Sequence, residues 1–169
     1  DTHCHIQHTN LDAEKVDLSN IEWLLIPGVN VKSSLSASKF SSTLPVKSYW
    51  GAGLHPHEAA NLNTQKDELL NLFQLSDAIG ETGLDYYRNL SDKASQIKSF
   101  EMHVASAIEL EKTLIVHCRD SFEDVHRIIE QNDFTAPVVL HSWTGGSKWT
   151  KKFMDLNVYF SFSGIITYE

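Results

Sequence analysis

Ala78-Ile-Gly-Glu-Thr-Gly-Leu84 is a short, mostly apolar run, which predicts a buried strand. Residues 91–112 follow, with apolar side chains every three or four positions. This spacing predicts an amphipathic helix whose N-cap is Ser91. The next apolar run, Thr113-Leu-Ile-Val116, predicts a second strand. A strand, a covering helix and a second strand form the unit from which parallel sheets are built.

The same alternation continues on both sides of this unit. Apolar runs predict further strands at residues 22–28, 49–54, 137–140 and 158–162, and residues 1–5 are counted as a first strand, which makes seven. Amphipathic segments predict helices at residues 59–75, 121–131 and 147–155. The Ser-rich segment 30–45 is interpreted as irregular, with a helix as the weaker alternative. The pattern indicates an α/β fold with a parallel sheet covered by helices.

The chain has 169 residues, 41% hydrophobic and 21% charged, which excludes a disordered or low-complexity protein. Its length suits one domain spanning residues 1–169. No apolar run approaches the roughly 18 residues that span a bilayer, so no membrane association is expected. The net charge of −8 argues against a basic DNA-binding surface, although divalent metals can supply positive charge locally. Two cysteines make no disulfide framework, which favours a cytoplasmic protein.

Histidine or glutamate stands at the end of several predicted strands. His3 and His5 lie two positions apart and share one face of the first strand, while Glu81, His117 and His141 each follow an apolar run. The carboxyl ends of barrel strands build active sites. One such histidine is more often a satisfied core residue, and His3 with His5 could belong to a polar surface strand. The whole set, however, favours a metal site with nitrogen and oxygen ligands for zinc, manganese or magnesium.

Five ordered motifs carry a resemblance that extends over essentially the whole chain. They are Asp1-Thr-His-Cys-His5, Gly53-Leu-His-Pro-His57, Gly80-Glu-Thr-Gly-Leu-Asp-Tyr-Tyr-Arg88, Val116-His-Cys-Arg-Asp120 and His141-Ser-Trp-Thr-Gly145. In this order they resemble the TatD family of metal-dependent deoxyribonucleases. The resemblance implies a TIM-like (β/α) barrel, hydrolysis of DNA phosphodiesters and one or two divalent ions. The implied metal ligands are His3, His5, Glu81, His117 and His141.

The chain departs from the family pattern at both ends. The family continues to an eighth strand that carries a metal-binding Asp, and it has apolar residues before the first Asp. We therefore expect an incomplete barrel with about seven of eight strands, truncated at both ends, in which the last strand and helix are missing. Related amidohydrolase barrels place a carboxylated Lys where this chain has Glu81, and the native carboxylate favours the TatD-like branch.

Two residues are interpreted as catalytic. Glu81 is expected to bridge two ions that activate water. Arg119 follows His117 closely and is expected to contact a phosphate in bidentate fashion, with a salt bridge to the adjacent helix start as an equal alternative.

Four residues are assigned to substrate binding. Tyr87 and Arg88 follow the strand that carries Glu81, where a nucleotide could stack, with loop packing as the alternative. His57 follows another strand, together with His55, and capping of the loop around Pro56 is the favoured alternative for both. Trp143 follows His141 and is expected to wall the site.

The remaining histidines and the alternatives for function receive simpler interpretations. His103 and His126 fall within predicted helices and are interpreted as surface or interface residues. The favoured function is a DNA-cleaving hydrolase with DNA as its partner. A hydrolase of the same barrel that acts on another ester or amide, and an inactive barrel fragment, remain alternatives. The sequence identifies no protein partner.

Overall fold

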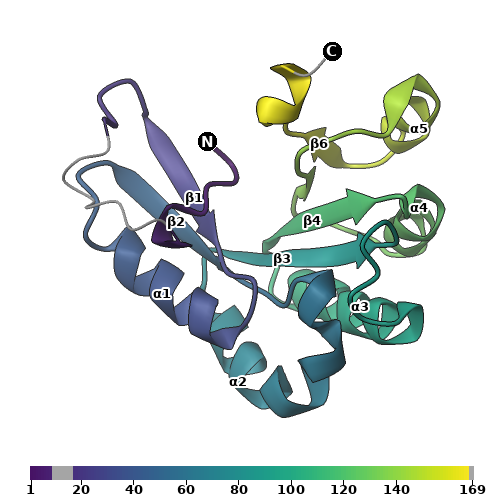
Figure 1. The fold of residues 1–169 in the computed structure, drawn as a ribbon, viewed down its shortest axis with the longest axis horizontal. Helices are drawn as coiled ribbons and strands as arrows, with labels where there is room; N and C mark the ends of the chain where they lie inside the picture. Colours follow the sequence, from purple (N-terminus) through teal and green to yellow (C-terminus); the bar gives the residue numbers. More distant parts are fainter. Residues whose placement is uncertain (9–16, 168–169) are drawn as a thin grey trace.

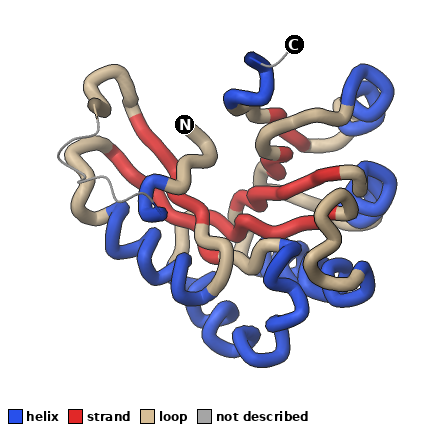
Figure 2. The backbone as a smooth tube through the Cα atoms, viewed as in Figure 1, coloured by secondary structure: helices blue, strands red, loops and turns tan. Residues whose placement is uncertain are grey.

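The computed structural model describes residues 1–8 and 17–167 (Figure 1). Within these residues, six parallel strands form one sheet in sequence order, and the sheet curves into a half-barrel (Figures 1 and 2). The strands are β1 (Trp23–Pro27), β2 (Lys47–Ala52), β3 (Ala78–Asp85), β4 (Thr113–Arg119), β5 (Val138–Leu140) and β6 (Val158–Phe160).

Helices connect the strands and cover the outer face of the sheet (Figure 2). They are α1 (Val31–Ser41), α2 (Leu62–Leu75), α3 (Lys93–Glu109), α4 (Phe122–Glu130) and α5 (Gly146–Phe153), with the short 3-10 turns η1 (Ile6–His8), η3 (Pro56–Asn61) and η4 (Gly164–Thr167). None of the described helices combines the length and the apolar character needed to cross a membrane. Strand following helix in this way confirms the predicted α/β fold class.

The main core lies between the helices and the outer face of the sheet. Leu69, Phe73, Phe100 and Leu114 are all fully buried there. Because side chains alternate along a strand, the other face of the same strands points into the half-barrel. Toward the amino ends of the strands this inner face is apolar. There Leu25, Ala78, Ile115 and Val139 pack together and line a cavity of about 650 Å³.

The predicted strand at residues 1–5 is wrong, and the described sheet therefore has six strands rather than seven. The segment still runs beside β1, because the Leu25 N–H donates to the Asp1 carbonyl and the Cys4 N–H donates to the Leu25 carbonyl. The chain then turns into η1 at Ile6, so these isolated bonds do not extend into a ladder.

Two other local interpretations change for identifiable reasons. The Ser-rich segment forms α1, because the Asn30 side chain caps the Ser33 N–H at 2.8 Å and small residues let the helix pack closely. Helix α3 begins at Lys93 and is capped by Asp92 instead of Ser91. The Ser91 hydroxyl is engaged elsewhere, donating to the His57 carbonyl and accepting from the Ala60 N–H. The remaining elements lie where the sequence predicts them, with boundaries shifted by a few residues.

Candidate metal centre

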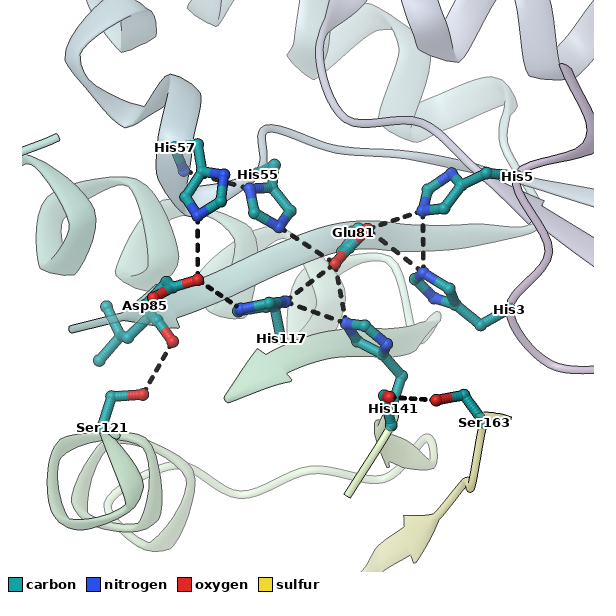
Figure 3. A network of polar contacts seen from close by, with 12 residues as sticks. His3, His5, His55, His57, Glu81, Asp85, His117, Ser121, His141 and Ser163 are labelled. Atoms are coloured by element: carbon teal, nitrogen blue, oxygen red, sulfur yellow. Dashed lines mark hydrogen bonds and ion pairs between the residues drawn. The ribbon is translucent and has the colours of Figure 1, made fainter. Parts of the chain in front are cut away.

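A cluster of histidine and acidic side chains lies at the carboxyl end of the sheet (Figure 3). It lines an open pocket of about 480 Å³. Strands β3 and β4 supply Glu81 and His117, and His141 follows β5 directly. His55 follows β2, while His3 and His5 come from the segment beside β1. Parallel strands thus bring residues that are far apart in sequence to one edge, as expected for this architecture.

Glu81 is the centre of the cluster, although its side chain is only 4% exposed. Its Oε2 atom lies 3.3 Å from His3 Nε2 and 3.0 Å from His5 Nε2. The Oε1 atom faces the other three rings, at 3.2 Å from His55 Nε2, 3.1 Å from His117 Nδ1 and 2.8 Å from His141 Nε2. Burial opposes ionisation, but hydrogen bonds from His117, His141, His3 and His5 hold the pKa of this carboxyl well below its usual value.

The local backbone around Glu81 depends on glycine. Gly80 has a φ of +133°, and the register between β3 and β4 shifts between Ile79 and Thr82. A Cβ atom at Gly80 would collide with the Ile115 carbonyl oxygen, so only glycine fits this conformation. The irregularity lets the strand present Glu81 to the pocket while Ile79 and Leu84 remain in the core.

Several ring nitrogens in the cluster face one another. His3 Nε2 lies 2.9 Å from His5 Nε2, and His117 Nδ1 lies 3.2 Å from His141 Nε2. Two unprotonated imidazole nitrogens both act as acceptors, so such contacts require a proton or a cation between them. Ligand atoms of His3, Glu81 and His141 lie within 4.8 Å of one another. The donor atoms of His55, Glu81 and His117 do the same, so the residues fit one or two divalent cations sharing Glu81.

A second carboxylate extends the cluster away from Glu81. Asp85 Oδ2 lies 3.0 Å from His117 Nε2 and 2.9 Å from His57 Nε2, and its Oδ1 accepts the Arg88 N–H. Burial again opposes ionisation, but hydrogen bonds from His117, Arg88 and His57 hold the pKa of Asp85 below its usual value. His117 therefore directs Nδ1 at Glu81 and Nε2 at Asp85.

The rings around the two carboxylates have different proton affinities. Burial disfavours a charged His117, but its hydrogen bonds to Asp85 and Glu81 prevail and raise its pKa to about 9. Burial of His141 outweighs its contact with Glu81 and lowers its pKa to about 4. His141 is thus a neutral ring with a lone pair available to a cation at neutral pH.

The structure brings together the five residues proposed from the sequence as ligands. It adds His55, whose ring contacts Glu81 and whose Nδ1 also accepts the His57 N–H, so contact with the site and capping of the loop coexist. It also adds Asp85, which sequence reasoning missed. Both lie in motifs quoted above at the ends of apolar strands, and that position was the available signal.

The predicted substrate residues divide into two groups. Tyr87 and Arg88 are exposed in the loop after β3, with Tyr87 63% exposed. The Arg119 guanidinium lies 4.0 Å from the centre of the Tyr87 ring. Trp143 is 7% exposed and packs against Phe153, so the predicted wall of the site is wrong for this residue. Its indole N–H already donates to the Thr150 hydroxyl, and the described lining of the pocket does not include it.

His103 is also misplaced by the sequence interpretation. It is fully buried in α3 rather than at a surface or interface. The signal was its position three residues after Phe100 and four before Ala107, which places it on the apolar face of the helix.

Known proteins similar to this chain include metal-dependent hydrolases and nucleases. A family model described as TatD related DNase matches residues 1–169. An uncharacterized metal-dependent hydrolase of Buchnera aphidicola subsp. Acyrthosiphon pisum is 35% identical over 193 residues, covering all of this chain and 71% of the relative. The 3'-5' ssDNA/RNA exonuclease TatD of Salmonella typhimurium is 28% identical over 156 residues, covering 89% of this chain and 59% of the exonuclease.

A solved structure shares the fold. The crystal structure of YJJV, a TatD homolog from Escherichia coli, superimposes with a TM-score of 0.83 at 21% sequence identity. The match covers 99% of this chain and 69% of that chain. The expected TIM-like barrel fold class is thereby confirmed, with the six described strands forming a half-barrel.

Proposed function

This chain belongs to the family of TatD-related DNases and metal-dependent hydrolases, and from that premise we propose that it hydrolyses phosphodiester bonds in DNA. The observation that carries the proposal is one buried carboxylate, Glu81, surrounded by five imidazoles at the open end of the sheet. The named activity of the Salmonella relative supports a nucleic acid substrate. Two free cysteines, Cys4 and Cys118, fit a reducing compartment such as the cytoplasm.

The chemistry of the donor set supports zinc over magnesium. Five ring nitrogens and one carboxylate suit zinc, whereas magnesium prefers an environment of oxygen ligands. One ion would be held by His3, Glu81 and His141 and a second by His55, Glu81 and His117, with His5 beside the first set. Manganese remains a member of the proposed set because mixed nitrogen and carboxylate ligands also accommodate it.

Bound divalent cations would lower the pKa of a water molecule and neutralise charge that develops on the phosphodiester. The side chains of the cluster support this chemistry through their charge states and orientations. Glu81 stays ionised although buried, because its hydrogen bonds with the histidines outweigh burial. Asp85 accepts from His117 Nε2 and so fixes the ring with Nδ1 toward Glu81. His141 remains neutral, so it needs no deprotonation before it binds a cation.

Substrate binding is proposed at the exposed rim beside the cluster. The Arg119 guanidinium and the Tyr87 ring form a stacked pair that offers both positive charge and an aromatic face. A guanidinium suits a phosphate, and an aromatic ring suits a base of a single strand. Arg88 lies next to Tyr87 and adds a second positive charge, while His57 lines the pocket and contacts Asp85. Local positive groups matter because the whole chain carries a net charge of −8.

The test is a turnover panel with purified, metal-stripped protein. Single-stranded DNA, double-stranded DNA, RNA and p-nitrophenyl esters are each assayed with zinc, manganese or magnesium restored. We expect metal-dependent cleavage of DNA, and parallel cleavage of RNA would widen the substrate class to both nucleic acids. Activity on simple esters with none on DNA would replace the nuclease by another hydrolase. Metal binding without turnover of any substrate would favour the inactive alternative for these residues.

A further inference from the structure

The backbone that delivers His55 to the cluster is held at three consecutive amides. Strand β2 ends at Ala52, and the Gly53 N–H then donates to the Ser34 hydroxyl at 3.3 Å. The Leu54 N–H donates to His103 Nε2 at 3.0 Å, and the His55 N–H donates to the Val29 carbonyl at 3.0 Å. Each amide is therefore held by a different part of the fold, and only the Leu54 amide is held by a titratable side chain.

The hydrogen bonds of His103 define its protonation state. Its Nδ1 lies 2.7 Å from the Ser99 carbonyl oxygen, which can only accept, so Nδ1 carries the proton. Its Nε2 faces the Leu54 N–H, which can only donate, so Nε2 presents a lone pair. The ring is fully buried against Phe73, and burial lowers its pKa to about 4, which keeps it neutral. Each ring nitrogen of His103 therefore makes one hydrogen bond, Nδ1 as the donor and Nε2 as the acceptor.

The Leu54 amide has no access to water that could replace this bond. Leu54 is fully buried, and a buried N–H without a partner destabilises the conformation that leaves it so. The segment also runs directly against the backbone of Glu81. A Cβ atom at Gly53 would lie 2.5 Å from the Glu81 carbonyl oxygen. A displacement of residues 53–55 would therefore disturb both the His55 ring and the strand that carries Glu81.

We propose that His103 is a positioning residue of the metal centre, which it does not touch. By accepting the Leu54 N–H, it fixes the backbone next to His55 and holds the His55 ring 3.2 Å from Glu81. A neighbouring contact on the same helix follows the same logic, because Gln96 of α3 holds both backbone groups of Asp85. The inference rests on the proposed metal site, since its consequence is the affinity for a cation.

The experiment compares His103→Leu, which removes the acceptor, with His103→Gln, whose side-chain oxygen can still accept the Leu54 N–H. Phe100→Leu is the matched control, because Phe100 is equally buried on α3 and is not a partner of the Leu54 amide. Zinc affinity is measured by competition with a chelator, and cobalt is used for its absorption spectrum. We expect His103→Leu to weaken binding about tenfold or more, as for other residues that support metal ligands. His103→Gln should stay within about threefold of the unchanged protein, and Phe100→Leu should lose stability without a change in affinity.

A second readout needs neither a bound metal nor a variant. Nuclear magnetic resonance of the metal-free protein should show His103 as the Nδ1–H tautomer, with slow exchange of the Leu54 amide. A protonated Nε2 would overturn the proposal even if His103→Leu failed to fold. Equal zinc affinity of His103→Leu and the unchanged protein would also overturn it. If the unchanged protein bound no cation, the proposed function would fail, and the tautomer and the Leu54 amide would still decide whether His103 positions this segment.

Discussion

Two polar clusters differ in whether each hydrogen-bond donor faces an acceptor. One consists of Gln96 and His103 on α3, and the other of Glu81 and the histidines around it. On α3, Gln96 accepts the Asp85 N–H at 2.8 Å and donates to the Ser91 carbonyl at 2.7 Å. His103 likewise uses each ring nitrogen once, with one donor and one acceptor. Both side chains are fully buried, yet donors meet acceptors. Such a matched set supports the backbone and needs no ligand.

The cluster around Glu81 does not match in this way. Five imidazoles converge on one carboxylate, and the nitrogens of His3 and His5 face each other at 2.9 Å. Lone pairs directed at a common point are what a cation requires. Burial and polarity alone therefore do not separate the two clusters. The distinguishing feature is the pairs of ring nitrogens that face each other and need a proton or a cation between them.

The largest effect on metal binding is expected when the charge of Glu81 is removed. Glu81→Gln keeps the shape of the side chain but replaces a carboxylate oxygen with a donor. Removing one member of a buried charged set costs about 3–5 kcal/mol, which corresponds to a loss of roughly 10²–10⁴-fold in metal affinity. We expect DNA cleavage to fall at least as far. Both are measured by chelator competition and by initial rates.

The matched control for this change is Glu58→Gln. Glu58 lines the same pocket, but its carboxylate accepts from Asn61 rather than from the histidines. The control should bind metal as the unchanged protein does. If both substitutions weakened metal binding equally, the general negative charge of the pocket would be responsible. Metal affinity would then not depend on the position of Glu81 among the histidines.

In the α3 cluster, His103 is expected to make the free energy of unfolding depend on pH. Burial lowers its pKa from 6.5 to about 4. Between these two pH values, His103 is therefore protonated in the unfolded chain and neutral in the folded chain. Stability is full above about pH 6.5 and declines as the pH falls toward 4, by roughly 3 kcal/mol over the whole window.

Urea unfolding of metal-free protein at pH 7 and at pH 4 measures this contribution. The difference in unfolding free energy between the unchanged protein and His103→Gln isolates His103, because the acidic groups of the Glu81 cluster are common to both. The unchanged protein should lose roughly 3 kcal/mol more than the variant between the two pH values. Identical pH dependence would mean that His103 is accessible to protons, contrary to its full burial.

Asp85 belongs to both clusters and should give an intermediate effect. Its backbone is held by Gln96, while its carboxylate accepts from His117 Nε2. Asp85→Asn keeps the backbone contacts but removes the charge behind His117. We expect metal affinity to fall about 10–100-fold, the range for partners that orient a metal-binding histidine. Asp124→Asn is the control, since Asp124 accepts from Tyr86 and Arg127 instead. An Asp85→Asn protein with unchanged affinity would show that His117 needs no orientation.

The fold was predictable where periodicity was strong. Apolar runs such as Thr113–Val116 and the spacing within α3 identified the α/β fold from the sequence. The first predicted strand failed because period-two alternation at Asp1–His5 fits an extended segment that never joins a ladder. Helix α1 was only the weaker alternative for its segment, because its burial uses serine and alanine, whose small size lowers the apolar signal.

The site was predictable to the extent that each ligand candidate ends an apolar strand. That rule found Glu81, His117 and His141 in sequence alone. It underweighted His55, because Pro56 suggested a purely local capping role, and both roles turned out to coexist. It could not find the support from His103, since a helical histidine gives no sign of the loop it will meet. That contact depends on how α3 packs against β3 and against the segment that follows β2, which only the tertiary structure reveals.

The smallest expected effect concerns the exposed rim, where Arg119 stacks on Tyr87. Unlike the two clusters, this pair is open to solvent, so its contribution should be modest. Arg119→Lys keeps the positive charge but loses the planar stack, and cation–π contacts at exposed sites contribute about 0.5–1 kcal/mol. We therefore expect KM for single-stranded DNA to rise about two- to fivefold with kcat and metal affinity unchanged. Arg127→Lys is the control, because Arg127 pairs with Asp124 on α4. A fall in kcat without a change in KM would instead place Arg119 at the reacting phosphate and extend the functional cluster out to the rim.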